Sequence, residues 1–261
     1  MKLRNAVVLA ALAASPALAS DTVTLTNITG AWFNPTPVVG IAIVNSPSTA
    51  IPSTIRWGVP AAPNTFQSGY DYTGMAGPLD FTVNPPPTTG AQLIGTFNHL
   101  NFPVFPPNLQ SVELNVAADV AVDGTPQGTF HFIFDFTHDE TPNGGPPGGP
   151  FTGTCPYPSP GSPNGTGINV NGCADQVTVT SGAASQSFVV AGVHYTLEVI
   201  GFSQDGGATI TNKFQTIEDQ NNTAGLYARV SATTPTVPEP ASLALLGLGL
   251  LAAGFARRKF R

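Results

Sequence analysis

The chain has 261 residues, of which 41% are hydrophobic and only 9% are charged, and its formal net charge is −6. Six of the nine basic residues lie in the two terminal segments, so residues 20–239 hold fifteen acidic and three basic residues, a formal charge of −12. A surface of this sign repels nucleic acid and anionic lipid, which excludes nucleic-acid binding. About 220 residues that are rich in Pro, Gly, Thr, Asn and Val and poor in Lys favour one large all-β domain.

The first nineteen residues have the order of a secretory signal peptide. Lys2 and Arg4 are followed by an apolar run over residues 6–14 and by Ala17-Leu18-Ala19, a small-x-small cleavage site. This pattern predicts cleavage between Ala19 and Ser20 and export across the inner membrane. The alternative, an uncleaved N-terminal anchor, is disfavoured because the apolar run is short.

Short stretches that alternate apolar and polar residues between Pro, Gly and Asn predict a series of β-strands. Prolines bound the second and third stretches, which is typical of edge strands or strand starts. The predicted strands are Thr22–Ile28, Val38–Val44, Thr54–Trp57, Gly90–Phe97, Ser111–Val120, Gly128–Thr137, Gln176–Thr180, Ser187–Ala191, Val193–Ser203 and Thr223–Ser231.

The clearest pair of predicted strands surrounds Asp123-Gly124, a dipeptide typical of two-residue hairpin turns. Apolar and polar residues alternate on both sides of it. The inward residues expected after the turn are Phe130, Phe132, Phe134 and Phe136. We therefore expect an antiparallel β-sandwich of jelly-roll type over residues 20–232, with this hairpin in its core.

The stretch from Thr141 to Gly172 is dense in Gly and Pro and has no periodic apolar pattern, which predicts a long loop. If Cys155 and Cys173 pair, as the oxidising compartment favours, they close a loop of about nineteen residues. Such a disulfide would stabilise the fold by up to about 3 kcal/mol. Two thiols without a nearby histidine pair do not predict a zinc site. Residues 233–237 are expected to form a linker.

Carboxylate and amide oxygens gather where the phenylalanine strand ends. Asp135, Asp139, Glu140 and Asn143 predict a calcium site there, because Ca²⁺ takes six to eight oxygen ligands. The competing interpretation is that Asp139 and Asn143 only accept hydrogen bonds from turn amides. Calcium is the one cofactor that the sequence suggests.

His99 and Arg56 are two further side chains that could carry chemistry. His99 lies in a stretch that predicts a polar turn, and we expect it to be a hydrogen-bonded structural residue because its neighbours supply no second catalytic group. Arg56 is one of three cations in an acidic domain, so we expect it to pair with a carboxylate and to stack near Trp57. Recognition of a sugar or carboxylate ligand by Arg56 is the alternative.

Sequence motifs of common enzymes are missing. The chain contains no Gly-x-Ser-x-Gly, no His-Glu-x-x-His and no phosphate-binding glycine loop. Glu113 and Glu198, both expected on polar strand faces, could form a glycosidase pair, but any acidic sandwich offers such pairs. The sequence therefore predicts no catalytic residue.

The C-terminal segment combines a short motif, an apolar run and a basic end. Pro238-Glu239-Pro240 precedes the uncharged residues 241–256, and four of the last five residues are basic. As a transmembrane helix, residues 241–256 would span roughly 24 Å, less than the ~30 Å hydrocarbon core of a bilayer. The basic end favours a cytoplasmic C-terminus, with the preceding chain outside the inner membrane. An amphipathic helix of the globular domain is disfavoured because Ser242 alone interrupts the apolar run.

Over residues 238–261 these features resemble the PEP-CTERM sorting signal of Gram-negative bacteria that make exopolysaccharide. In that family an exosortase, a membrane-embedded cysteine protease, recognises the tail and removes it near the motif. The resemblance implies that an exosortase-type enzyme is a partner. It also implies that the protein is held transiently in the inner membrane and then reaches the envelope, the surface or the extracellular matrix.

The central domain contains four distinctive local patterns, Ile55–Pro60, Gln67–Tyr70, Gly95–Pro103 and Phe136–Asn143. In this order and spacing they resemble the choice-of-anchor domain family, most nearly type K, over most of residues 22–232. Domains of that family occur in bacterial surface proteins and have no assigned activity. The resemblance therefore implies a secreted surface β-domain and no site residues.

These features predict an exported, non-catalytic surface or matrix protein associated with exopolysaccharide. One alternative is a carbohydrate-binding module, calcium-dependent or not, with exposed aromatics among Trp32, Trp57, Tyr70 and Tyr72. An enzyme that acts on polysaccharide is the third hypothesis. Exposed aromatics beside a concave face would favour the binding module, whereas buried aromatics would favour the structural protein.

Overall fold

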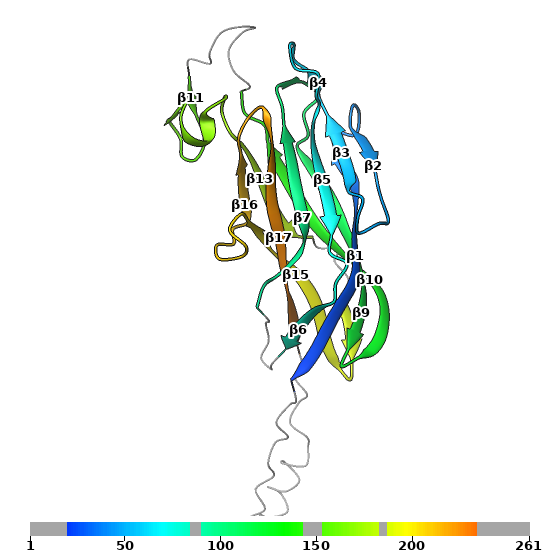
Figure 1. The fold of residues 1–261 in the computed structure, drawn as a ribbon. Helices are drawn as coiled ribbons and strands as arrows, with labels where there is room; N and C mark the ends of the chain where they lie inside the picture. The colour runs from blue at the N-terminus through cyan, green and yellow to red at the C-terminus, as the bar shows by residue number, and fades with distance from the viewer. Residues whose placement is uncertain (1–19, 84–89, 143–152, 183–186, 234–261) are drawn as a thin grey trace, which may run out of the picture.

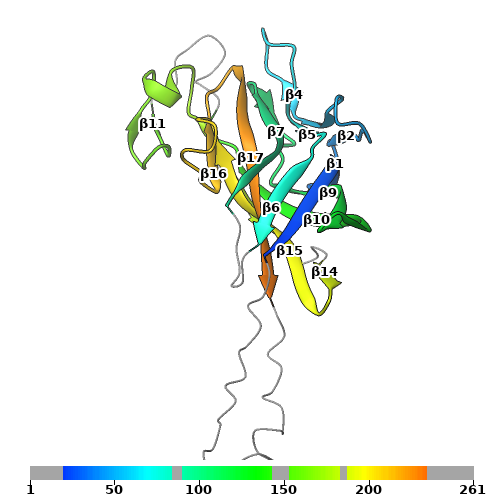
Figure 2. The same ribbon diagram turned by 60° about the horizontal axis from the view of Figure 1, so that its bottom comes forward.

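The computed structural model describes residues 20–83, 90–142, 153–182 and 187–233. Within these ranges strands form two large antiparallel sheets and two short ribbons, and one short 3-10 turn, η1 (Gly167–Asn169), is the only helical element. Figures 1 and 2 show the sheets as two layers of an elongated sandwich. The predicted all-β antiparallel architecture is confirmed, and the finer jelly-roll winding stays a prediction.

The first layer is a six-stranded sheet with the order β16-β13-β10-β9-β1-β6. Its strands are β1 (Asp21–Thr36), β6 (Leu79–Val83), β9 (Ser111–Val122), β10 (Thr125–Asp139), β13 (Asp175–Ser181) and β16 (Lys213–Thr216). The predicted hairpin is confirmed, since Val122 pairs with Thr125 across Asp123 and Gly124. Both turn residues have positive φ, +48° and +75°, as a two-residue type I′ turn requires.

The second layer is a seven-stranded sheet with the order β14-β15-β17-β7-β5-β3-β2. Its strands are β2 (Ala42–Val44), β3 (Ser53–Trp57), β5 (Ser68–Gly74), β7 (Gln92–Asn101), β14 (Ser187–Val190), β15 (Val193–Ser203) and β17 (Gln220–Thr233). Two short ribbons complete the described fold: β4 (Val59–Pro60) with β8 (Val104–Phe105), and β11 (Thr154–Cys155) with β12 (Ser162–Pro163).

Most of the predicted strands are present, but several boundaries differ. β1 continues to Thr36 because an irregularity between Thr26 and Thr29 carries the chain past Asn27, which has a positive φ of +51°. β2 is shorter than predicted and forms the edge of its sheet, whereas β3 lies one strand further in. The alternation of apolar and polar residues did not predict β5, β6 or β16.

Glycines in two strands make room for the ring of Tyr72. A Cβ atom at Gly30 of β1 or at Gly95 of β7 would overlap this ring. The ring is buried between the sheets, and its hydroxyl donates a hydrogen bond to the Ile94 carbonyl at 3.1 Å. These glycines are therefore required by close packing.

Aromatic rings from both sheets fill the core. Phe132, Phe134 and Phe136 of β10 are at most 1% exposed, which confirms their predicted inward direction, and Phe130 is partly buried. The Phe136 ring lies 5.2 Å from Trp32 and 5.5 Å from the Phe97 ring of β7, measured between centroids. Phe97 and Phe136 thus join the two layers.

The first and last described strands meet at one end of the sandwich, which we call the terminal end (Figure 1). At the start of β1, Asp21 accepts a hydrogen bond from the Tyr195 hydroxyl, and the adjacent His194 pairs with Thr233 at the end of β17. β10 begins after the turn at Asp123-Gly124, where the Asp123 amide donates to the Thr22 carbonyl of β1, and it runs to the opposite end, where it finishes at Asp139. We call this opposite end the distal end.

The predicted disulfide between Cys155 and Cys173 is present, with a sequence separation of 18. Residues 143–152 of the predicted loop lie outside the described residues, as do the predicted signal peptide and residues 234–261. None of the residues that the structure describes belongs to a helix long and apolar enough to cross a membrane. The predicted membrane helix at 241–256 falls outside these ranges and stays a prediction.

Candidate functional site

At the distal end, inward-facing positions that are apolar along most of each strand become polar. In β10 the series of buried phenylalanines ends in His138, and in β7 Phe97 is followed by His99. Because alternate residues of a strand face the same side, these polar groups continue the core-facing rows. The titratable members are His99, His138, Glu140, Asp175 and Glu218, which we call the distal cluster.

The two histidines of the distal cluster come from different sheets. Their ring centroids lie 5.1 Å apart, edge to face. His99 Nδ1 forms a 2.8 Å hydrogen bond with the Thr216 hydroxyl, and His138 Nδ1 lies 2.6 Å from the Tyr70 hydroxyl. Burial lowers the pKa of His99, and the neighbouring His138 lowers it further.

Three carboxylates surround these rings. Glu140 Oε2 lies 3.0 Å and Asp175 Oδ2 3.8 Å from His138 Nε2, while the Tyr70 hydroxyl faces the other ring nitrogen, His138 Nδ1. Burial raises the pKa of Asp175, and the charges of Glu140 and Glu218 raise it further. The pKa of Glu218 is raised to about 8, mainly by burial and to a smaller extent by the charge of Glu140.

Several buried atoms of the distal cluster have no hydrogen-bond partner within the described part of the chain. These are His99 Nε2, Asp175 Oδ2 and both carboxylate oxygens of Glu218. By contrast, Asp175 Oδ1 accepts bonds from the Thr141 amide at 2.7 Å and the Thr141 hydroxyl at 2.9 Å. Buried polar atoms are usually paired, so this arrangement is able to hold protons or a cation.

The structure revises the prediction for His99. Its hydrogen bond to Thr216 is of the structural kind that the sequence predicts, but the residue lies within β7 and not in a turn. A second titratable group does lie beside it, His138, which is 39 positions further along the chain and in the other sheet. Strand alternation predicts the inward direction of His138, whereas the meeting of the two rings depends on the stacking of the sheets.

The residues of the predicted calcium site have different neighbours. Asp135 lies beside Glu113, and burial together with that charge raises its pKa. Asp139 accepts a hydrogen bond from the Tyr157 hydroxyl, and Glu140 faces His138. Asn143 lies outside the described residues, so this calcium site stays a prediction.

Arg56 forms the predicted ion pair, with its guanidinium 2.7 Å from Asp71. The expected stacking on Trp57 is wrong, because adjacent residues of β3 point to opposite faces of the sheet. Trp57 instead lies in the core, where its ring centroid is 4.8 Å from Tyr70 and 5.9 Å from His99. Arg56 therefore stabilises the outer face of the sheet.

The four aromatic residues proposed for sugar binding are all buried. Trp32, Trp57, Tyr70 and Tyr72 have at most 1% of their surface exposed. Apolar rings on inward positions of β1, β3 and β5 gain more from packing between the sheets than from exposure. The prediction that these residues form an exposed binding platform is wrong.

The proposed glutamate pair is also separated. Glu113 lies on the partly exposed face of β9, and Glu198 lies in β15 of the other sheet. Glu198 accepts hydrogen bonds from Arg229 at 3.0 Å and from the Ser231 hydroxyl at 2.6 Å. These positions do not form a glycosidase pair.

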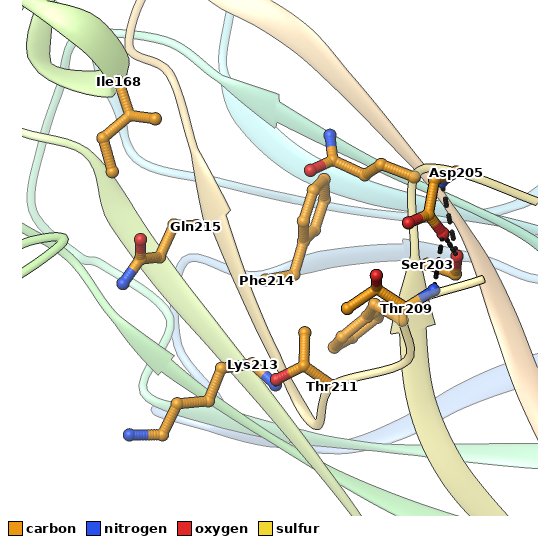
Figure 3. A pocket seen from close by; sticks show the side chains of 10 residues that line it. Ile168, Ser203, Asp205, Thr209, Thr211, Lys213, Phe214 and Gln215 are labelled. Atoms are coloured by element: carbon orange, nitrogen blue, oxygen red, sulfur yellow. Dashed lines mark hydrogen bonds between the residues drawn. The ribbon is translucent and has the colours of Figure 1, made fainter. Parts of the chain in front are cut away.

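A cleft of about 620 Å³ lies between η1 and the connection from β15 to β16 (Figure 3). The Asp205 carboxylate on its rim accepts hydrogen bonds from the Thr209 amide at 2.9 Å and the Ser203 hydroxyl at 2.7 Å. These bonds lower the pKa of Asp205 to about 2. None of the site residues that the sequence predicts lines this cleft. Asp205 stabilises the loop between β15 and β16 through its bonds to Ser203 and Thr209.

The comparison with protein families gives one match. A model of the PEP-CTERM protein-sorting motif matches residues 236–259, and no curated protein matches the chain. The motif indicates an exported protein that is processed by an exosortase and sorted to the cell envelope or surface. The match covers only the tail and gives no evidence for a choice-of-anchor domain, so that resemblance stays a prediction.

Proposed function

We propose that the chain is a non-catalytic surface or matrix protein that an exosortase-type enzyme cuts from a transient inner-membrane intermediate. The signal peptide is removed between Ala19 and Ser20, and the tail is removed near Pro238-Glu239-Pro240. The mature sandwich then remains in a layer rich in exopolysaccharide. The observation that carries this proposal is the sorting-motif match at residues 236–259.

The geometry of the sandwich is consistent with such an intermediate. β1 begins at Asp21, directly after the proposed cleavage site, and β17 ends at Thr233, shortly before the matched motif. Both lie at the terminal end, so a membrane-held tail would leave the distal end facing away from the membrane (Figure 2). The disulfide also suits an oxidising compartment outside the cytoplasm.

Replacement of Pro238, Glu239 and Pro240 by alanine in the producing bacterium tests the sorting step. We expect the triple variant to stay in the inner-membrane fraction with its basic end attached, whereas the wild-type protein leaves that fraction. Thr234→Ala, in the linker before the motif, is the matched control and should be sorted normally. Equal release of the triple variant and the control would contradict the proposed processing.

Association with exopolysaccharide requires its own experiment. The protein should sediment with the matrix of the producing strain and pass into the medium of a strain that makes no exopolysaccharide. The same distribution in both strains would remove exopolysaccharide from the proposal and leave the sorting step intact.

A further inference from the structure

The distal cluster brings together nitrogen and oxygen atoms that can ligate a metal, and two of them lack a hydrogen-bond partner among the described residues. His99 Nε2 and Asp175 Oδ2 are buried and make no hydrogen bond within the described part of the protein. Donor atoms of His99, His138 and Asp175 all lie within 4.8 Å of one another. Burial of such atoms is costly unless a ligand pairs with them, and their proximity indicates a ligand that binds between them.

The opposite atom of each of these side chains is already held by a second partner. Thr216 bonds His99 Nδ1, Tyr70 bonds His138 Nδ1, and Thr141 donates twice to Asp175 Oδ1. This is the arrangement around protein-bound metals, where outer hydrogen bonds fix the ligand orientation and leave the inner atom for the metal.

The charge of the distal cluster also favours a cation. Three carboxylates approach one another here, while the basic residues of the described domain are engaged or exposed elsewhere. Arg56 pairs with Asp71, Arg229 pairs with Glu198, and Lys213 is exposed on β16. Among the described residues no Lys or Arg pairs with Asp175 or Glu218, and a bound cation would offset the charge of these buried carboxylates.

We propose that His99, His138 and Asp175 bind one divalent transition-metal cation, with Zn²⁺ the best fit, and that Glu140, which lies 3.0 Å from His138 Nε2, moves onto the cation as the fourth ligand. Tetrahedral Zn²⁺ with bonds of ~2.1 Å separates its ligand atoms by about 3.4 Å. The distances from His138 Nε2 to Glu140 Oε2 and Asp175 Oδ2, 3.0 and 3.8 Å, lie on either side of this value. Two imidazoles favour Zn²⁺ over Ca²⁺, which prefers an all-oxygen set of ligands.

The metal would join the two layers of the sandwich. His99 belongs to β7 of the seven-stranded sheet, whereas His138 and Asp175 belong to β10 and β13 of the six-stranded sheet. Because the unfolded chain does not hold these ligands together, binding stabilises the folded state. This inference concerns the interior of the sandwich and does not depend on the proposed sorting function.

Zinc loading of the full exported chain, purified in mild detergent, tests the proposal directly. The protein is treated with a chelator, equilibrated with Zn²⁺ or Ca²⁺, and separated from free metal before elemental analysis. We expect one Zn²⁺ and no Ca²⁺ retained per chain, together with a higher melting temperature in Zn²⁺. Failure of the folded wild-type protein to retain Zn²⁺, or retention of Ca²⁺ alone, would overturn the proposal.

Asp175→Asn is the most conservative variant of a ligand, because its Oδ1 can still accept the bonds from Thr141. We expect at least a tenfold loss of Zn²⁺ affinity in this variant and in His99→Gln. His131→Gln is the matched control, since His131 is exposed on β10 and is hydrogen-bonded to Asn115. Loss of Zn²⁺ in the His131 variant equal to the loss in the Asp175 variant would contradict the assignment.

Cobalt loading of the wild-type protein covers the case in which the ligand variants do not fold. Co²⁺ bound to two imidazoles and two carboxylates should give the intense visible bands of tetrahedral coordination, and Zn²⁺ should displace them. A purely octahedral spectrum, or no change on addition of Zn²⁺, would overturn the proposed site.

Discussion

Replacement of Phe136 by alanine tests the aromatic core that joins the two sheets. The side chain is 1% exposed, and its ring contacts aromatic rings of both layers, at centroid distances of 5.2 Å to Trp32 and 5.5 Å to Phe97. Truncation of a buried phenylalanine costs about 3–5 kcal/mol through lost burial and the cavity that remains. Domains are typically stable by only ~5–15 kcal/mol, so the variant should lose a large fraction of its stability.

Urea unfolding followed by tryptophan fluorescence measures this loss as a lower midpoint at an unchanged slope. For a domain of this size we expect a melting temperature lower by roughly 6–20 °C. Phe105→Ala is the matched control, because Phe105 is 57% exposed and its truncation should change stability by at most about 0.5 kcal/mol. Equal midpoints for the two variants would refute the assignment of Phe136 to the core.

Three further predictions concern the acid response, the glycine packing and the disulfide. Hydrogen bonds, chiefly from the Thr209 amide, hold the pKa of Asp205 at about 2, so its contribution to stability is complete above the unfolded pKa near 4 and is lost as the pH falls toward 2. Wild-type stability should therefore fall more between pH 5 and pH 2.5 than that of Asp205→Asn, and parallel losses would argue against this role. Gly30→Ala should lower the free energy of unfolding by about 1–3 kcal/mol, because the new methyl group overlaps the Tyr72 ring. The loss should be smaller in a Tyr72→Leu background, and an equal loss in both backgrounds would contradict the contact. Reduction of the disulfide should lower stability by up to about 3 kcal/mol, as read from urea midpoints with and without reductant, and an unchanged midpoint would show that the closed loop adds no stability.

The sequence predicts the fold best where periodicity and turn chemistry agree. The hairpin around Asp123-Gly124 is confirmed because a strong turn signal lies between two alternating strands. β5 gives a weaker signal because Tyr70 and Tyr72 are its only large apolar residues, and the space for the Tyr72 ring comes from a glycine in each sheet. β16 is four residues long, and Phe214 is its only apolar residue.

The composition of the distal cluster could be predicted from the sequence only in part. Strand alternation predicts the inward direction of His138, but the acidic neighbours in its own segment suggest a calcium site at the strand end. Asp175 begins β13, which pairs with β10, and Glu218 follows β16, the next strand of the same sheet, so strand pairing brings them toward His138 while the stacking of the sheets brings in His99. Such non-local contacts depend on strand order, which alternation within one strand does not specify.

The intact mass of the protein recovered from the envelope or medium of its native host tests the sorting account most directly. We predict a chain that begins near Ser20, ends near Pro238-Glu239-Pro240 and contains the Cys155–Cys173 disulfide. A mass that includes the C-terminal residues 257–261 would contradict removal of the tail and would make the segment a permanent anchor.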